Sequence, residues 1–126
     1  MSNLPQFRES DSVVAEIVLW AFETGSLPER MNITIKADDV TTFPIAKGTV
    51  MAIDSVGGIY AAPYTDGDPK YGTAIGLLDE EIAEDAIGST PQNVAGIIGI
   101  RGTAYEAVVT GLDAAGKADM PTIIFV

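Results

Sequence analysis

The chain has 126 residues, of which 47% are hydrophobic and 20% charged, a balance typical of one globular domain and not of a disordered chain. It contains no cysteine and no histidine, which excludes disulfides, thiolate or imidazole metal ligands, and cysteine or histidine catalysis. Its net charge of −11, from 18 acidic and 7 basic residues, disfavours binding to nucleic acids and to anionic membranes.

The beginning of the chain is interpreted as an arm. Residues 1–12 are mostly polar and predict a flexible segment. The apolar run Val13–Phe22 is shorter than the roughly 20 residues that span a bilayer, and no basic segment precedes it as in a secretory signal. Its periodicity fits a helix as well as a strand. We therefore expect an N-terminal arm over 1–24 and a β-rich domain over 25–126.

From Met31 onward the sequence predicts short strands separated by turns. The expected strands cover 31–36, 49–54, 59–62, 73–78, 94–100, 103–109 and 122–126. Val56-Gly57-Gly58 is typical of a hairpin turn, and Leu112–Ala118 predicts a short helix or a turn. Short strands with frequent turn signals and little helix predict a mainly β domain, built as a small barrel or sandwich.

Five acidic residues crowd one short stretch of the chain. They are Asp79, Glu80, Glu81, Glu84 and Asp85. One interpretation is a divalent-cation site or an acid–base pair of a carboxylate enzyme. The other is a solvated edge whose charge prevents sheets from pairing with one another. Like charges at this density usually remain in water, so we expect a patch on the solvent side, away from the apolar strands.

Two glycine-containing segments are better explained by structure than by ligand binding. Gly96–Gly102 lacks the patterns of dinucleotide and phosphate loops, so we expect close backbone approach in a packed sheet. Asp66-Gly67-Asp68 is similar to the start of a calcium loop, but Tyr71 and Leu77 occupy the positions that require Gly and Glu. A turn is expected there.

Lys70 is the only loop candidate for a carrier-type lysine modification, and its flanking residues do not fit such a motif.

Three further side chains have two interpretations each. Trp20 and Phe22 are expected to pack in the core, although aromatic residues are also enriched at the centres of interfaces. Arg101 follows an apolar strand. It is interpreted either as a salt-bridge partner in a subunit interface or as an exposed arginine whose stem covers apolar surface.

A set of motifs in a defined order resembles the head decoration proteins of tailed bacteriophages, the lambda-like capsid-stabilising family. The motifs are Lys47–Ala52, Gly58-Ile59-Tyr60, Pro63-Tyr64, Gly72–Leu78, Gly99–Gly102 and Tyr105-Glu106. The resemblance covers roughly residues 25–110. Residues 1–24 carry no matching pattern, and 111–126 match only loosely.

The resemblance implies a β-clip or β-tulip type of fold with no catalytic residue and no cofactor. The protein would be a homotrimer on the outer surface of the virion, at three-fold and quasi-three-fold sites of an icosahedral head. Its partner would be the major capsid protein, and it would stabilise the expanded head against internal DNA pressure. The alternatives are a small acidic β-barrel binding module and a metal-dependent carboxylate enzyme centred on the acidic stretch.

The resemblance also implies that the N-terminal arm over 1–24 is the capsid-binding segment. It would add a strand to a capsid sheet, a mode in which main-chain bonds provide affinity. The arm residues expected to bind the capsid are Leu4, Phe7, Val13 and Val14. The candidates for the trimer interface are Trp20, Phe22, Arg101 and Tyr105.

Overall fold

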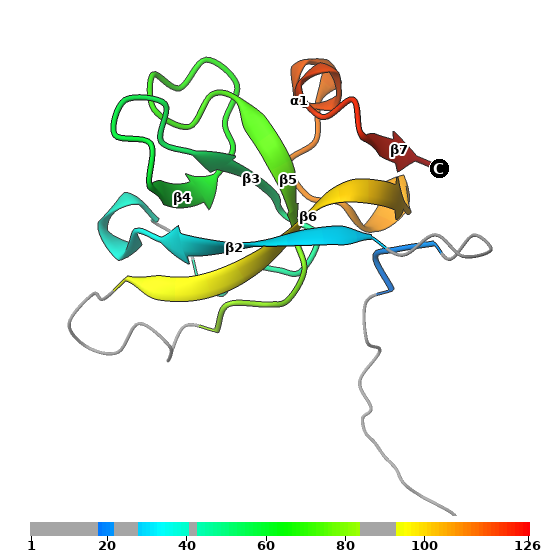
Figure 1. The fold of residues 1–126 in the computed structure, drawn as a ribbon, viewed down its shortest axis with the longest axis horizontal. Helices are drawn as coiled ribbons and strands as arrows, with labels where there is room; N and C mark the ends of the chain where they lie inside the picture. Colours follow the sequence, from blue (N-terminus) through cyan, green and yellow to red (C-terminus); the bar gives the residue numbers. More distant parts are fainter. Residues whose placement is uncertain (1–17, 22–27, 41–42, 84–92) are drawn as a thin grey trace, which may run out of the picture.

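The computed structural model describes residues 18–21, 28–40, 43–83 and 93–126. Five strands close into a β-barrel, and one additional strand extends it (Figure 1). The predicted mainly β fold with little helix is therefore confirmed.

The sheet order is β2-β4-β3-β5-β6-β7, and a pairing between β2 and β6 closes the barrel. The strands are β2 (Glu29–Ile35), β3 (Val50–Ile53), β4 (Tyr60–Pro63), β5 (Ala74–Leu78), β6 (Val94–Ala104) and β7 (Ile123–Phe125). The helical elements are the 3-10 turns η1 (Ala37–Asp39) and η3 (Glu106–Val108) and the helix α1 (Ala114–Asp119). The β2–β4 and β6–β7 pairs are parallel, and the other pairs are antiparallel.

Most predicted elements appear close to their expected positions, with one clear exception. The hairpin through Val56-Gly57-Gly58 and the short helix after Leu112 are confirmed. The helix begins where the Asp113 side chain accepts a hydrogen bond from the Gly116 N–H at 2.7 Å. The strand expected over 103–109 is wrong beyond Ala104. There the chain turns through η3, so that the Thr110 N–H donates to the Gly48 carbonyl.

The apolar side chains form two cores on opposite faces of the same strands. The barrel interior holds Ile33, Ile35, Ile45, Met51, Ala61, Leu78, Ile82 and Ile98. The outer core includes Leu19, Trp20, Val50, Ala52, Ala62, Leu77, Ala104, Met120 and Ile123. Neighbouring residues such as Leu77 and Leu78 are both fully buried because they face different cores. Two-sided burial explains why β5 is apolar without alternation.

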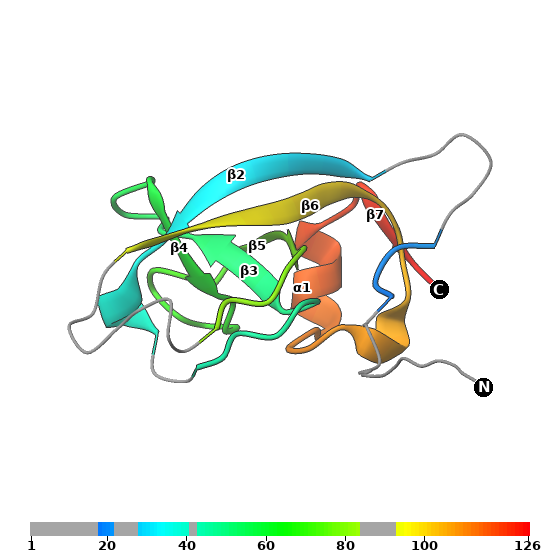
Figure 2. The same ribbon diagram turned by 90° about the horizontal axis from the view of Figure 1, so that it is seen from below.

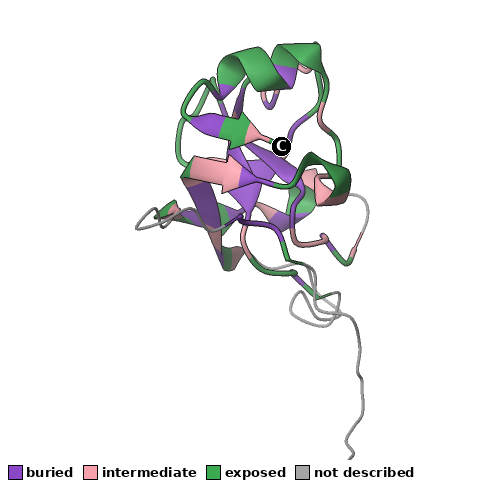
Figure 3. Ribbon diagram, turned by 90° about the vertical axis from the view of Figure 1, so that its right-hand side faces the viewer, coloured by how far each residue is buried: buried purple, intermediate pink, exposed green. Residues whose placement is uncertain are grey.

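The elements that cover the outer core come from the two ends of the described chain. Residues 18–21, α1 and β7 lie together beside the barrel (Figure 2). The outward side of α1 is exposed, whereas the strands beneath are largely buried (Figure 3). The entry of the N-terminal segment and the C-terminal strand are thus brought to one side of the molecule.

Candidate interaction surface

Exposed apolar side chains lie on the backbone segments that meet at the end of β6. Six large hydrophobic residues are exposed in the part of the chain that the structure describes, and four of them lie here. We name this group, Val18, Tyr105, Ile124 and Val126, the β7 surface. Tyr105 is 42% exposed and each of the other three is 62% exposed. Exposed apolar side chains on adjoining segments make this end of β6 a candidate binding site.

Three neighbouring backbone segments build the β7 surface: residues 18–21, the end of β6, and β7 (Figure 2). On one side of β6, residues 18–21 run antiparallel to it. The Ala21 N–H donates to the Thr103 carbonyl and the Tyr105 N–H donates to the Leu19 carbonyl, both at 2.8 Å. On the other side, β7 runs parallel to β6. The end of β6 is therefore the central strand of this small sheet.

Alternation along β7 divides its side chains between the core and the surface. Ile123 is buried and Phe125 is partly buried against the outer core. Ile124 and Val126 point the other way and are exposed. The sequence predicted this strand, but it did not indicate that its outward residues would join Tyr105, because strand neighbours cannot be read from one sequence.

The outer edge of β7 has no strand beside it among the described residues. Bonds from β7 to β6 fall on alternate residues: the Thr122 carbonyl accepts from Gly102, and the Val126 N–H donates to Ala104. The backbone N–H and C=O of Phe125 consequently point away from β6. They are free to pair with an added strand.

The indole of Trp20 anchors the N-terminal segment to the barrel. Its Nε1–H donates to Asp79 Oδ1 at 2.7 Å, and the same carboxylate pairs with the Arg30 guanidinium. The ring lies directly over Gly99, where an added Cβ would come within 2.0 Å of it. Trp20 is only 6% exposed as a result. The close approach expected in the glycine-rich strand is confirmed at Gly99.

The predicted interface residues occupy different environments. Trp20 lies in the outer core of its own chain, as its core interpretation expected, and Tyr105 lies on the β7 surface. Arg101 is exposed and its Nε is 3.0 Å from Glu29 Oε1 of the same chain. Their contact with a second copy stays a prediction. The remaining candidates, Leu4, Phe7, Val13, Val14 and Phe22, lie outside the described residues.

The acidic stretch is not uniformly solvated. Glu80 and Glu81 are exposed, as expected. The expectation is wrong for Asp79, because Trp20 and Arg30 engage both of its carboxylate oxygens. Glu84 and Asp85 lie outside the described residues. Within 18–21, 28–40, 43–83 and 93–126, no three acidic side chains are grouped to hold a metal ion.

A second charged cluster, which the sequence did not indicate, joins three loops. Lys70 Nζ lies 3.3 Å from Asp39 Oδ2 and 3.8 Å from Asp54 Oδ2. A hydrogen bond from the Tyr71 hydroxyl, aided by Lys70, lowers the pKa of Asp39. Backbone N–H groups of Gly57 and Val56 lower the pKa of Asp54. Burial, reinforced by Asp39, raises the pKa of Tyr71. The cluster fixes the turn between β3 and β4.

The turn expected at Asp66-Gly67-Asp68 is confirmed. Gly67 has a φ of +83°, a conformation that glycine adopts without strain. Asp68 Oδ1 accepts hydrogen bonds from the backbone N–H groups of Lys70 and Tyr71, at 2.8 and 2.9 Å. The Asp68 carboxylate is thus hydrogen-bonded to the backbone of its own loop.

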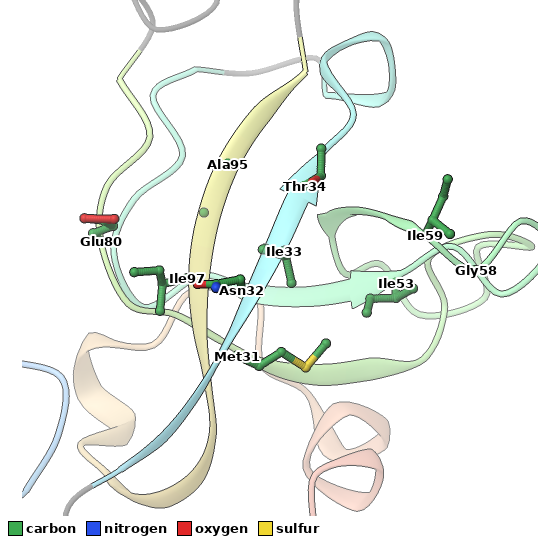
Figure 4. Close-up of a pocket in the computed structure, with 11 residues that line it drawn as sticks. Met31, Asn32, Ile33, Thr34, Ile53, Gly58, Ile59, Glu80, Ala95 and Ile97 are labelled. Carbon is green, nitrogen blue, oxygen red and sulfur yellow. The ribbon is translucent and has the colours of Figure 1, made fainter.

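A shallow hollow of about 660 Å³ lies over β2, beside the turn between β3 and β4 (Figure 4). It is lined mainly by Met31, Ile33, Ile53, Ile59 and Ile97, with Glu80 at one side. Its lining is chiefly apolar and includes a single carboxylate. The hollow therefore presents no pair of carboxylates for acid–base chemistry.

No family model matches the chain, and no curated protein matches it either. In the described part of the chain, none of the helices has the length and apolar character needed to cross a membrane.

Proposed function

We propose that this chain is a structural protein of a virion, a homotrimer that binds the outer surface of an icosahedral phage head and stabilises it after expansion. The observation that carries the proposal is the β7 surface. It combines four exposed apolar side chains with an unpaired strand edge, beside the point where residues 1–17 join the fold. Both features suit a protein that works by backbone pairing and packed surfaces.

Several motifs of the resemblance lie in or beside strands of the barrel. Lys47–Ala52 leads into β3, Gly72–Leu78 forms β5, and Gly99–Gly102 lies in β6. Gly99 has a defined task there, since it provides the space for Trp20. Three of the motifs that support the resemblance therefore lie in neighbouring strands, β3-β5-β6.

The mechanism is mechanical. Each copy presents an N-terminal arm, with Leu4 and Phe7 among its apolar residues, that adds a strand to a sheet of the major capsid protein. Three arms on one trimer raise the overall avidity, because the binding of the first arm concentrates the other two at the shell. A closed three-fold ring of identical chains fits a three-fold site without leaving an unmatched contact.

The direct test is binding to expanded heads that lack the protein. Purified chain is mixed with such heads, and both co-sedimentation and resistance of the heads to heat and chelators are measured. We expect saturable binding and a gain in resistance. A variant that lacks residues 1–12 should form the same oligomer and lose the binding. Failure of the full chain to bind, or to protect the heads, contradicts the proposal.

A matched control separates the arm from the barrel. Val56 is 79% exposed at the far turn between β3 and β4, away from the β7 surface. The variant Val56→Asp should bind heads as the full chain does. If deletion of 1–12 leaves binding unchanged while the heads are still protected, the arm is not the element that binds the shell.

A further inference from the structure

The free edge of β7 is short, at three residues, and carries neither a charged residue nor a proline. Natural edge strands are commonly shielded by charged residues or by proline within the strand. The segment Thr122–Val126 has neither, and two of its side chains are apolar and exposed. Its unpaired backbone groups at Phe125 lie between these side chains. A backbone segment that pairs here would cover Ile124 and Val126 at the same time.

A suitable donor adjoins the same surface. Residues 13–17 read Val-Val-Ala-Glu-Ile, with three β-branched side chains and one charge. They join the fold at Val18, which enters on the side of β6 opposite to β7. We infer that residues 13–17 of one copy pair with the free edge of β7 in the next copy. The inference rests on the proposed homotrimer and assigns its interface.

The arrangement of donor and acceptor favours exchange between copies. Residues 18–21 and β7 lie on opposite sides of β6, so a segment that precedes Val18 would have to cross β6 to reach β7 of its own chain. Between copies no reversal is needed. Because donor and acceptor are different surfaces, the contact is head-to-tail. Such a contact forms a closed ring of three when each copy is rotated by one third of a turn relative to the one before it. In this ring Val13 and Val14 belong to the subunit interface, whereas Leu4 and Phe7 extend beyond it toward the shell.

The absence of cysteine from the chain allows a clean test by disulfide trapping. One variant carries a donor cysteine, made by scanning V13C, V14C, A15C and E16C in turn, and a second carries I124C. The two have tags of different size and are refolded together and oxidised. We expect one or two donor positions to give a mixed disulfide dimer. The double variant V14C/I124C should give covalent species up to a closed trimer.

The matched control replaces I124C by V56C, which places an exposed cysteine at a distant turn. It should give no mixed dimer with any donor. An intrachain disulfide alone in the double variant shows pairing within one copy and overturns the inference. A chain that is monomeric in solution, or a stable oligomer in which no donor position is trapped, overturns it too.

The outcomes are distinguishable from those for the proposed function. Head binding is measured with the untrapped full chain and does not depend on how copies pair. Binding without trapping contradicts only the inferred interface. Trapping without binding shows that the copies exchange arms in a protein that does not decorate heads.

Discussion

Gly99 determines how the N-terminal segment reaches the barrel. The Trp20 ring occupies the space that a side chain at position 99 would fill, and Asp79 holds its Nε1–H. The glycine and the tryptophan are distant in sequence, so the pair depends on the fold to bring them together. Position 99 therefore controls a tertiary contact and not a turn.

Replacing Gly99 by alanine should displace the Trp20 ring, because the new Cβ would lie 2.0 Å from it. We expect a loss of about 1–3 kcal/mol in the free energy of unfolding, as for other overpacked sites. Denaturant unfolding measures the loss. The emission of the single tryptophan should shift to the red as the ring becomes exposed.

The control for Gly99→Ala is the same change made in a Trp20→Ala background. The contact then no longer exists, and the cost of the alanine should largely disappear. An equal cost in both backgrounds would show that the glycine serves the strand backbone and not the indole.

Asp39 provides a test of pH dependence. Its pKa is lowered from the ordinary value of 3.8 by the Tyr71 hydroxyl and by Lys70. A lowered pKa in the folded state stabilises the fold above pH 3.8, and this contribution is lost as the pH falls through the lowered value. Asp39→Asn should therefore reduce stability at pH 6 more than at pH 2.5, as measured by urea unfolding.

The neighbouring Asp38 is exposed and supplies a matched control for this comparison. Asp38→Asn should leave the difference in stability between the two pH values close to that of the original chain. If Asp39→Asn lowers stability equally at both pH values, the cluster stabilises the fold by packing and not by charge.

At the scale of elements, β5 is buried on both faces. Leu77 faces the outer core and Leu78 the barrel interior, each at 0% exposure. In a sheet with one wet face, one of two consecutive residues would be exposed. Here residues 18–21, α1 and β7 remove that wet face. The integrity of β5 therefore depends on both ends of the chain.

Replacing either leucine by alanine should be destabilising, by about 2–5 kcal/mol for each as is typical of buried leucines. Ile59→Ala, at a side chain that is 69% exposed, should change stability very little. Thermal and denaturant unfolding give the comparison. A neutral Leu77→Ala would show that the outer core contributes little to stability.

Strand alternation and turn residues were sufficient to predict the mainly β fold. The alternation of Met31, Ile33 and Ile35 with polar residues predicted β2, and the glycine pair after Val56 predicted the hairpin. The strand expected through Val109 failed because its residues are apolar enough for a strand, but the chain must turn there to reach Gly48. A local sequence pattern does not show that a tertiary contact requires the chain to turn.

The candidate surface was much less predictable. Tyr105 is among the interface candidates that the sequence provides. Val18, Ile124 and Val126 are not, because their place beside Tyr105 depends on strand order. The partners of Asp79 were missed for the same reason, since Trp20 lies 59 residues away in sequence. A charged residue in an acidic run is ordinarily assigned to solvent. Only the fold shows which acidic residue of the run accepts a hydrogen bond from the indole of Trp20.

At the scale of the whole molecule, net charge opposes assembly. Each copy carries −11, so copies in the proposed ring would repel one another while their apolar surfaces attract. Salt screens the repulsion, with a Debye length that falls from about 10 Å at 0.1 M to about 3 Å at 1 M. Burial of apolar side chains is not weakened by this screening.

We therefore expect the proposed homotrimer to become tighter as sodium chloride is raised from about 0.1 M to about 1 M. Light scattering over a dilution series measures the midpoint of dissociation at each salt concentration.

The same series distinguishes the two interpretations of Arg101. If its contact with Glu29 in the single chain is replaced by ion pairs between copies, salt should loosen the ring. Arg101→Ala should then abolish the loosening. A ring that becomes looser as salt is raised contradicts an interface centred on Ile124 and Val126.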